Sequence, residues 1–497
     1  MSVARLRGGG TSDHPTSAPK RITVLGAGVA GLVAAADLER LGHRVLIMEG
    51  SKRIGGRVYT HRFGRAKGSP FAELGAMRIS VGHTRTLGYI AQLGLLDQLC
   101  EFRTTLSDDG NLLRSEDGSH VRVHEAQKEL VGHLTFRLGT QKYRYNTLLF
   151  GSWLNVCLSA VAPQRFQDYP GTNTELLDLV DRIDLDSYLY GDNRSKVDLL
   201  SLFSDHPHLR ARIASKHDRF LYDALVETNF AFRLRDGMDT LTTALARKIR
   251  GTILLGHEVV GLSVQDHDVA VEVRHGTTAT TWYCDYVLCT IPFSVLRGLR
   301  LDGFDDDKLS IIRETAYWPA TKIAFHCREP FWIADGISGG GSVTGGLVRQ
   351  TYYPPAPDDP SLGATLLASY TIGADADEIS RLDPVTRRAV VVEEVSRMHP
   401  RLREPGMILE TASQVWGEHR WSRGAATIRW AQDAATREEQ RRAAARPQNR
   451  LFFAGEHCSS EPAWIEGAIE SAIDAVHSVD AHEPAGRPAA TLVRSTD

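Results

Sequence analysis

Three glycines near the start of the chain are the residues whose spacing most clearly suggests chemistry. They stand in the run Gly26-Ala27-Gly28-Val29-Ala30-Gly31, which has the GxGxxG spacing of a dinucleotide-binding turn. Gly26 would permit a tight turn, Gly28 would let the backbone approach a pyrophosphate, and Gly31 would allow a helix to pack closely on a strand. The run therefore predicts a phosphate-binding turn, with Ala30 at the start of the helix that follows.

The elements around this turn supply the frame that it needs. Residues 21–25 (RITVL) predict a buried strand, residues 32–41 carry apolar residues at helical spacing, and residues 43–48 (HRVLIM) predict a second strand. Glu49 follows directly, 18 residues after Gly31, where a carboxylate accepts hydrogen bonds from a ribose and repels a 2′-phosphate. This strand, helix and strand with an acidic end predict a site for FAD or NAD rather than NADP.

Two further glycine motifs lie elsewhere in the chain. Residues 54–58 (IGGRV) follow the second strand, and an arginine there suits phosphate because its planar guanidinium binds phosphate oxygens in a fork. Residues 450–456 (RLFFAGE) predict a strand that ends in a glycine turn, and residues 464–476 predict a helix. Acidic side chains recur on that helix every four residues, and we expect this stripe to be exposed to solvent: Glu466, Glu470 and Asp474.

Together these motifs resemble those of the flavin amine oxidase family, whose FAD site is built from both ends of the chain. The resemblance covers residues 21 to about 480 and is strongest at 21–80 and 450–476. It implies that Arg57 approaches the FAD pyrophosphate and that Glu456 contacts the ribityl region. Besides the first glycine turn, the residues that it places around FAD are Glu49, Gly56, Arg57, Gly75, Ala76, Met77, Arg78, Val259, Trp421, Gly455, Glu456, Trp464 and Ile465.

A second set of residues resembles the substrate site of the L-amino-acid oxidases in this family. In residues 71–78 (FAELGAMR), Arg78 stands where these enzymes bind the substrate carboxylate, which a guanidinium fork matches. The resemblance makes Tyr370 the partner of Arg78 and makes Lys322 the lysine that reaches flavin N5 through a water. Taken alone, these could be an ion-pair arginine, a packing tyrosine and a surface lysine. Two more residues complete the predicted site, a carbonyl for the substrate amine and an aromatic wall: Ala463 and Trp464.

The resemblance implies oxidation of an L-amino acid by FAD. Hydride would pass from the α-carbon to flavin N5, the imino acid would hydrolyse to the 2-keto acid and ammonia, and molecular oxygen would become hydrogen peroxide. FAD would be bound noncovalently, because residues 421–427 (WSRGAAT) have no cysteine where monoamine oxidases attach theirs. Three alternatives stay open: an amino-acid 2-monooxygenase that forms an amide, an amine or polyamine oxidase, and a flavin-binding protein without turnover.

The composition and charge of the chain limit the kinds of molecule that it is expected to bind. The 497 residues are 42% hydrophobic and 24% charged with a formal net charge of −3, which argues against a nucleic-acid partner. No run of eighteen apolar residues occurs, so we expect no membrane-spanning helix, and residues 1–20 lack a secretory signal, so we expect a cytoplasmic protein. Six cysteines without CxxC spacing, and histidines without an HExxH pattern, predict neither disulfides nor a metal site.

The predicted fold class is α/β (α+β). It combines a Rossmann-like (GR2-type) FAD-binding domain, an interleaved substrate-binding domain with a mixed sheet, and a helical subdomain over the entrance. Their predicted ranges are 21–80, 235–310 and 440–482 for the first, 81–110 and 311–439 for the second, and 111–234 for the third. We expect disorder at 1–20 and 483–497, and the family resemblance suggests a homodimer.

The resemblance is faintest over residues 105–230, where we expect the identity of the substrate to be set. The aromatic residues there suggest a large apolar or aromatic L-amino acid. Most of these side chains would belong to a core, and the candidates to line the entrance are Trp153, Leu154, Phe203, Phe220, Tyr222 and Phe230.

Overall fold

A five-stranded parallel sheet forms the centre of one lobe, and its strands come from three separate parts of the chain. The computed structural model describes residues 18–65, 68–114, 118–138, 142–161, 173–191, 194–213, 231–427 and 434–483. The strand order is β12-β2-β1-β16-β25, and each neighbouring pair is parallel. The strands are β1 (Arg21–Leu25), β2 (Arg44–Glu49), β12 (Thr252–Leu255), β16 (Tyr286–Cys289) and β25 (Leu451–Phe453).

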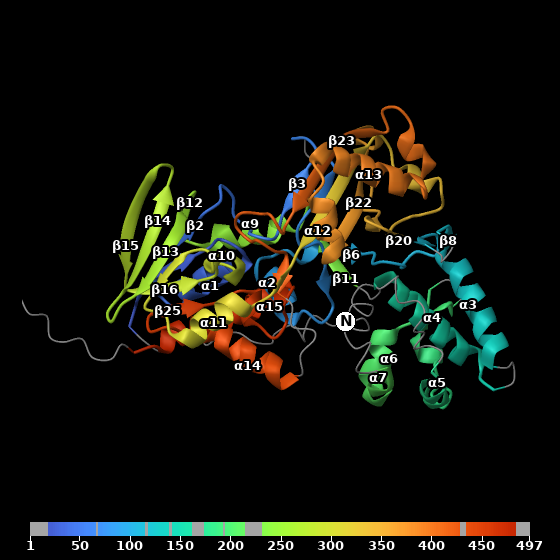
Figure 1. Cartoon of the computed structure of the whole chain (residues 1–497), viewed down its shortest axis with the longest axis horizontal. Helices are drawn as coiled ribbons and strands as arrows, with labels where there is room; N and C mark the ends of the chain where they lie inside the picture. Colours follow the sequence, from blue (N-terminus) through green and yellow to red (C-terminus); the bar gives the residue numbers. More distant parts are fainter. Residues whose placement is uncertain are drawn as a thin grey trace, which may run out of the picture.

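Both faces of this sheet are covered, as expected for a parallel sheet. Ile22 and Val24 point to the face on which α1 (Val29–Arg40), α9 (Asp239–Lys248) and α15 (Ile465–Ala481) pack. Leu25 and Val287 belong to the core on the other face, with a second, four-stranded sheet in the order β15-β14-β13-β17 (Figure 1). Its strands are β13 (Glu258–Val264), β14 (Val269–His275), β15 (Thr278–Cys284) and β17 (Arg300–Asp302).

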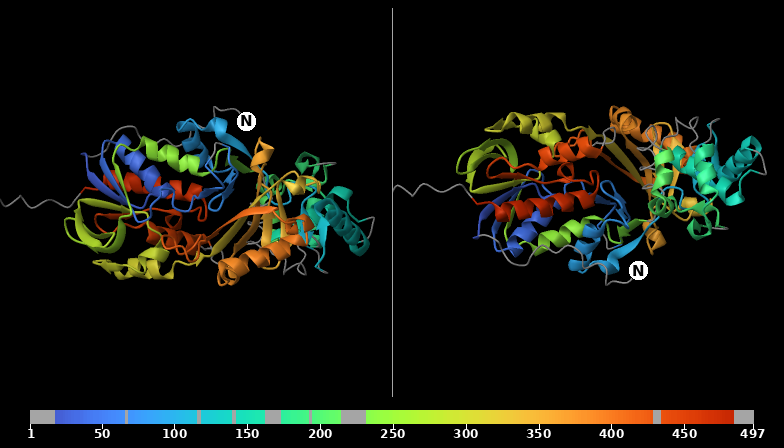
Figure 2. Two further views of the ribbon diagram at one scale, coloured as in Figure 1. Left: turned by 90° about the horizontal axis from the view of Figure 1, so that it is seen from above. Right: turned by 90° about the horizontal axis from the view of Figure 1, so that it is seen from below.

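A seven-stranded mixed sheet forms the second lobe, in the order β23-β19-β22-β21-β20-β7-β8. Helix α13 (Pro384–Ser396) packs on one face of it, where Val391 and Val395 join Ile323 and Leu366 in a common core. The strands are β7 (Leu112–Arg114), β8 (His120–Arg122), β19 (Ala320–Cys327), β20 (Gly341–Gly345), β21 (Arg349–Tyr352), β22 (Ala364–Ile372) and β23 (Ile408–Val415). In Figure 2 the seven-stranded sheet and strands β13–β15 lie on opposite sides of the five-stranded sheet of the first lobe.

A group of helices packs against the far end of the seven-stranded sheet. Its core includes Val343 of β20 and Leu113 of β7, so the sheet and the helices share one hydrophobic cluster. The helices are α3 (Val123–Leu138), α4 (Tyr145–Val161), α5 (Thr174–Val180), α6 (Leu199–Asp205) and α7 (Pro207–Ile213). The range 111–234 thus also contains β7 and β8, which lie at the edge of the seven-stranded sheet.

Short strands connect the two lobes around the segment that holds Arg78. Strand β11 (Ala231–Leu234) pairs with β5 (Ile79–Ser80) on one side and with β6 (Leu99–Phe102) on the other. Strands β3 (Thr60–Arg62) and β4 (Phe71–Glu73) form a hairpin just before it, and β18 (Tyr317–Trp318) pairs with β24 (Ala426–Thr427). The remaining helices of the lobes are α2 (Thr84–Gln92), α10 (Phe293–Leu296), α11 (Asp306–Glu314), α12 (Ala374–Ser380) and α14 (Ala434–Ala445).

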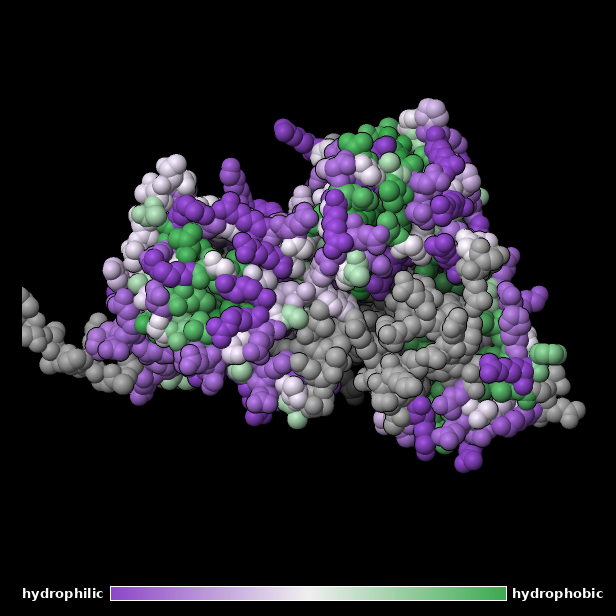
Figure 3. Space-filling model, viewed as in Figure 1, coloured by the Kyte–Doolittle hydropathy of each residue, from purple (hydrophilic) through white to green (hydrophobic). Residues whose placement is uncertain are grey.

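This arrangement of parallel and mixed sheets with helices confirms the predicted α/β (α+β) class. In the view of Figure 3 the surface is mostly hydrophilic, and hydrophobic side chains gather over the sheets of the two lobes. Within the described ranges, no helix has both the length and the apolar character to span a bilayer. The same ranges hold no cluster of three or more His, Cys, Asp or Glu that could bind a metal ion.

Candidate active site

One cavity of about 670 Å³ brings together residues from both lobes, and its size suits a cofactor-sized ligand. Of the residues predicted to bind the cofactor or the substrate, all but Gly31 line this cavity. Gly31 packs behind Gly26 and does not reach the cavity wall. The predicted residues that line the cavity are Gly26, Gly28, Ala30, Glu49, Gly56, Arg57, Gly75, Ala76, Met77, Arg78, Val259, Lys322, Tyr370, Trp421, Gly455, Glu456, Ala463, Trp464 and Ile465.

The glycine turn leaves room for a pyrophosphate because side chains are missing there. Gly26 has φ +106°, and its N–H donates to Met48 O at 2.7 Å. A Cβ on Gly31 would lie 2.0 Å from Gly26 O, and a Cβ on Gly56 would lie 3.1 Å from Gly28 Cα. Helix α1 begins directly after the turn, so its first N–H groups favour an anion at this position. These features fit the phosphates of FAD.

Glu49 is held in one orientation at the end of β2. Its Oε2 accepts from the N–H of Ala27 at 2.8 Å, and its Oε1 accepts from the N–H of Ser51 at 2.8 Å. A carboxylate has about four acceptor positions, so further acceptor capacity faces the cavity for ribose hydroxyls. The fixed carboxylate fits the ribose role that the sequence suggested.

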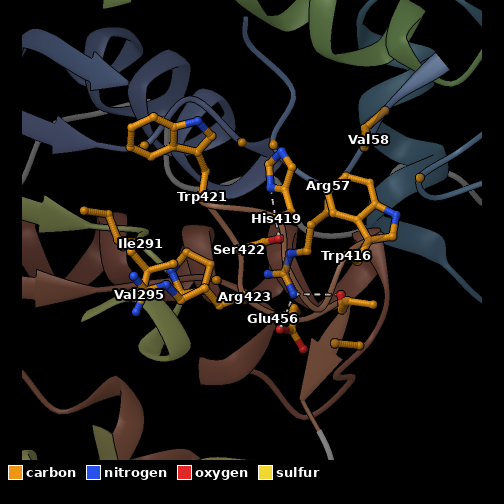
Figure 4. A pocket seen from close by; sticks show the side chains of 18 of the residues that line it. Arg57, Val58, Ile291, Val295, Trp416, His419, Trp421, Ser422, Arg423 and Glu456 are labelled. Carbon is orange, nitrogen blue, oxygen red and sulfur yellow. Dashed lines mark hydrogen bonds and ion pairs between the residues drawn. The ribbon is translucent and has the colours of Figure 1, made fainter. Parts of the chain in front are cut away.

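Arg57 and Glu456 form a buried ion pair at the middle of the cavity (Figure 4). Arg57 Nη1 donates to Glu456 Oε1 at 2.7 Å and to Ala425 O at 3.0 Å. Burial alone would raise the pKa of the Glu456 carboxyl, but the Arg57 guanidinium, His457 and the Thr427 hydroxyl together outweigh burial and lower this pKa to about 2. Glu456 Oε2 also accepts from Thr427 Oγ1 at 2.7 Å and from the N–H of Ala463 at 3.0 Å. Glu456 is therefore a permanent anion that ties Arg57 to the Ala463 segment.

Arg78 lies at the other end of the cavity, against aromatic rings. Its side chain is largely buried, and its guanidinium carbon lies 5.6 Å from the centroid of the Trp464 ring. Its Nη1 donates to Tyr352 Oη at 3.5 Å, and this hydroxyl is 2.7 Å from Thr105 Oγ1. Sequence reasoning missed Tyr352, which lies on β21 beside Tyr370 of β22, with ring centroids 6.5 Å apart. The only signal for Tyr352 was its place in the apolar and aromatic run 351–353 (TYY).

Lys322 is buried where β19 meets the segment that leads to Arg78. Its Nζ donates to Gly75 O at 2.7 Å and to Glu73 O at 3.2 Å, and it lies 4.6 Å from the centroid of the Tyr370 ring. Lys322 and Tyr370 face each other directly across the β19–β22 pair. The structure thus places the predicted lysine and tyrosine side by side at the cavity wall.

Glu73 is a second residue that sequence reasoning missed. Burial raises the pKa of its carboxyl to about 7, although the N–H of Met238 and the hydroxyl of Thr60 donate to it at 2.7 Å and 2.9 Å and oppose the rise. Its place beside Lys322 makes the charge in this corner of the site depend on pH near neutrality. No motif in the sequence marked it, because its burial comes from the packing of β4 against the second lobe.

Ala463 and Trp464 form the wall that begins helix α15. Ala463 has φ +72°, a left-handed conformation that favours glycine, and its N–H is held by Glu456. The Trp464 ring packs edge-to-face against His83 with centroids 4.7 Å apart, and burial lowers the pKa of His83 to about 4. His83 is therefore a neutral ring at neutral pH. It supports Trp464 from behind.

The prediction that the acidic stripe of the C-terminal helix is exposed was wrong for two of its three members. Glu466 is buried because α2 packs against it: the N–H and hydroxyl of Thr86 donate to its Oε2 at 2.8 Å and 2.7 Å. Glu470 is buried and accepts from the hydroxyl of Ser460 at 2.8 Å. Asp474 alone is exposed. The helical spacing correctly grouped these residues, but the neighbours of α15 decided which were covered.

Three of the candidates to line the substrate entrance are core residues of the helical group instead. Trp153, Leu154 and Phe203 are buried in its hydrophobic cluster. The other three, Phe220, Tyr222 and Phe230, lie outside the described residues.

Comparisons with known proteins find relatives that match nearly the whole chain. A family model described as flavin-containing amine oxidoreductase matches residues 29–479. A flavin-dependent L-tryptophan oxidase, RebO of Lentzea aerocolonigenes, is 53% identical over 93% of this chain and 98% of its own length. An L-amino-acid oxidase of Pseudechis australis is 26% identical over 94% of this chain and 87% of its own length.

A solved structure shares the fold at low sequence identity. Putrescine oxidase, in its wild-type form bound to putrescine, is 17% identical and matches with a TM-score of 0.62 over 94% of this chain and all of that chain (100%). This likeness concerns the fold alone.

Proposed function

Because the chain belongs to the family of flavin-containing amine oxidoreductases, we propose that it oxidises a large aromatic L-amino acid with molecular oxygen. The resemblance seen in the sequence and the FAD cofactor are confirmed, and the protein is an FAD-dependent enzyme of L-amino-acid oxidative deamination. The aromatic substrate is supported by the 53% identity to an L-tryptophan oxidase.

The observation that carries the proposal is the buried guanidinium of Arg78 at the end of the cavity. It is only 8% exposed, and the Trp464 ring and the Tyr352 hydroxyl flank it. A guanidinium at the cavity wall suits a carboxylate, because its permanent charge and planar fork can bind two carboxylate oxygens at once. An α-amino acid carries such a carboxylate, whereas a simple amine substrate does not.

The cavity residues divide between cofactor and substrate. The glycine turn and Arg57 would hold the phosphates of FAD, Glu49 its ribose, Val259 its adenine, and the start of α15 its flavin ring. When bound, FAD supplies the acceptor for the α-hydrogen and its electron pair, and returns the electrons to oxygen as hydrogen peroxide.

On the substrate side, Arg78 and Tyr370 bind the carboxylate, and the carbonyl of Ala463 accepts a hydrogen bond from the amine. Trp464 then walls the site, so the α-carbon is held in one orientation and positioning does most of the catalytic work. Lys322, a buried ammonium at the same wall, assists the reaction with oxygen. The imino acid that leaves the site hydrolyses in water to the 2-keto acid and ammonia.

The test compares L-tryptophan with tryptamine, which has the same side chain and amine but no carboxylate. Wild-type protein mixed anaerobically with L-tryptophan should lose its flavin absorbance, and tryptamine should leave it unchanged. Arg78→Met should lower kcat/KM for L-tryptophan at least about 30-fold. Arg78→Lys, which keeps the charge but not the fork, should fall between them.

Other outcomes separate the alternatives. Bleaching by tryptamine that Arg78→Met does not weaken would indicate an amine oxidase. Formation of the amide with loss of carbon dioxide, in place of the keto acid and hydrogen peroxide, would indicate a monooxygenase. No bleaching by any amino acid would leave a flavin-binding protein without turnover. Light scattering of the purified protein tests the homodimer that we also propose.

A further inference from the structure

The buried carboxylate of Glu466 joins the start of α15 to the start of α2. Glu466 is 3% exposed, and its Oε1 accepts from the N–H of Arg85 at 3.0 Å. Its Oε2 accepts from the N–H and the hydroxyl of Thr86 at 2.8 Å and 2.7 Å. His83, which precedes α2, makes no side-chain hydrogen bond to these N–H groups. A carboxylate from another helix therefore takes the place of the N-terminal cap of α2.

The two helix starts that Glu466 joins lie next to residues that we assign to the substrate. On α15, Trp464 stands just before the first turn and lines the cavity. Before α2, Arg78 also lines the cavity and is followed by β5 and a short turn. The Arg78 guanidinium carbon lies 5.6 Å from the centroid of the Trp464 ring. Glu466 itself does not line the cavity, so it acts on the substrate only through these neighbours.

The turn between Arg78 and α2 is closed by hydrogen bonds and packs against Trp464. The N–H of Ser80 donates to His83 Nδ1 at 3.2 Å, and the N–H of His83 donates to Ser80 O at 3.0 Å. The His83 ring packs edge-to-face against the Trp464 ring, with centroids 4.7 Å apart. Because the turn is tightly bonded, a displacement of the start of α2 is transmitted to Arg78.

We infer that Glu466 is a positioning residue, which holds the Arg78 segment at a fixed place against Trp464 so that the bound amino acid keeps one orientation in the cavity. The inference rests on the proposed function. Reacting groups must lie about 3–3.5 Å apart, and a displacement near 1 Å lowers a rate about 100-fold. The charge suits the position as well, because a carboxylate is stabilised at the N-terminal ends of helices, and Glu466 lies at two of them.

The experiment replaces Glu466 with glutamine, which keeps the shape of the side chain but sets an amide N–H against the donors of α2. Holoenzyme is mixed anaerobically with L-tryptophan, and the limiting rate of flavin bleaching is measured. We expect Glu466→Gln to lower this rate at least about tenfold. The Kd of indole-3-propionate, which lacks the amine and is not oxidised, should change less than about threefold. A large loss of rate with little loss of binding is the result expected from misplaced substrate.

Glu39→Gln is the matched control, because Glu39 is also a buried carboxylate that caps backbone N–H groups. It accepts from the N–H groups of Arg250 and Gly251 at 2.7 Å and 2.6 Å, but it lies near the end of α1 and does not line the cavity. Glu39→Gln should lose a similar amount of stability in urea and keep the bleaching rate within about twofold of wild type.

Two further measurements show whether Glu466 acts through the start of α2. Thr86→Val removes one donor to Glu466 and should lower the bleaching rate about threefold, whereas Thr86→Ser keeps the hydroxyl and should retain the rate. The double variant of Glu466→Gln and Thr86→Val should be no slower than Glu466→Gln alone, since both changes break the same contact. Hydrogen exchange at the amides of Arg85 and Thr86 should be faster in Glu466→Gln.

The results that overturn the inference differ in their meaning. If Glu466→Gln keeps the rate within about twofold of wild type, or if Glu39→Gln lowers the rate equally, Glu466 does not position the substrate, although the proposed function stands. If Glu466→Gln does not fold, equal rates for Thr86→Val and Thr86→Ser overturn the inference in its place. If no L-amino acid bleaches the flavin of the wild-type protein, the proposed function itself is wrong, and the role of Glu466 falls with it.

Discussion

Replacing Glu456 with glutamine tests whether one buried carboxylate holds the flavin end of the site together. Its Oε1 accepts from Arg57 at 2.7 Å, and its Oε2 accepts from Thr427 Oγ1 at 2.7 Å and from the N–H of Ala463 at 3.0 Å. Glutamine has nearly the same shape, but one end of its amide only donates. Glu456→Gln therefore sets an N–H group against at least one donor and removes the counter-charge of Arg57.

Two lines of reasoning give a similar size for the effect. Removing one partner of a buried ion pair costs about 3–5 kcal/mol, and the Glu456 side chain is 5% exposed. Separately, burial would raise the pKa of Glu456, but Arg57, with His457 and the Thr427 hydroxyl, outweighs burial and lowers this pKa to about 2 from an ordinary 4.5. A difference of about 2.5 in pKa corresponds to about 3 kcal/mol. We expect Glu456→Gln to lower the free energy of unfolding by about 3 kcal/mol at pH 7.

The lowered pKa also predicts how the difference in stability between wild type and Glu456→Gln changes with pH. Because the folded pKa is lowered, the stabilisation by Glu456 is present above pH 4.5 and is lost as the pH falls toward about 2. Urea unfolding of wild type and variant should therefore differ most at pH 7 and progressively less between pH 5 and 3.

A matched variant and a second readout complete the test. Glu470→Gln changes another buried carboxylate, which accepts from Ser460, and should cost less than about 1 kcal/mol. Flavin absorbance after gel filtration should fall in Glu456→Gln alone. A loss below about 1 kcal/mol at pH 7, or a difference that stays constant down to pH 3, would refute the reasoning.

Three further predictions test other parts of the site. Glu73 has a pKa raised to about 7 by burial, so its stabilisation is present below pH 4.5 and is lost as the pH rises through 7. Wild type should therefore melt at a lower temperature at pH 8 than at pH 5. In Glu73→Gln this difference in melting temperature between the two pH values should be smaller. Ala463→Gly should melt no lower than wild type because glycine accepts φ +72° without strain, whereas Ala463→Val should lose more than about 1 kcal/mol of stability. Gly31→Ala would place a Cβ 2.0 Å from Gly26 O and should abolish FAD retention, whereas Gly132→Ala, in open space on α3, should retain FAD. Equal flavin content in the two alanine variants would contradict the role given to the glycine turn.

Much of the cofactor half was predictable because its signals are local. The strand before Gly26, the helix after it and the second strand that ends at Glu49 follow one another within 30 residues. Their apolar spacing and the glycines describe one continuous unit, whose backbone geometry depends little on the rest of the chain. The family, the fold class and FAD were predicted on this basis and are confirmed.

The acidic stripe on α15 shows where local signals end. The spacing placed Glu466, Glu470 and Asp474 on one side of the helix, but α2 and the Ser460 segment cover the first two. Periodicity describes how side chains group around a helix axis, and it does not describe which neighbour packs there.

The sequence by itself determined the glycine turn, the acidic end of β2 and the types of residue that could bind a cofactor and a carboxylate. Only the tertiary structure decided that Tyr352 reaches Arg78 and that Glu73 lies beside Lys322. The physical reason is that a turn and its flanking strands depend on nearby residues, whereas these contacts depend on how β4 and the Arg78 segment pack against β19, β21 and β22. The two contacts join residues 274 and 249 positions apart, and a shift of one residue in the register of those strands would turn each side chain to the opposite face.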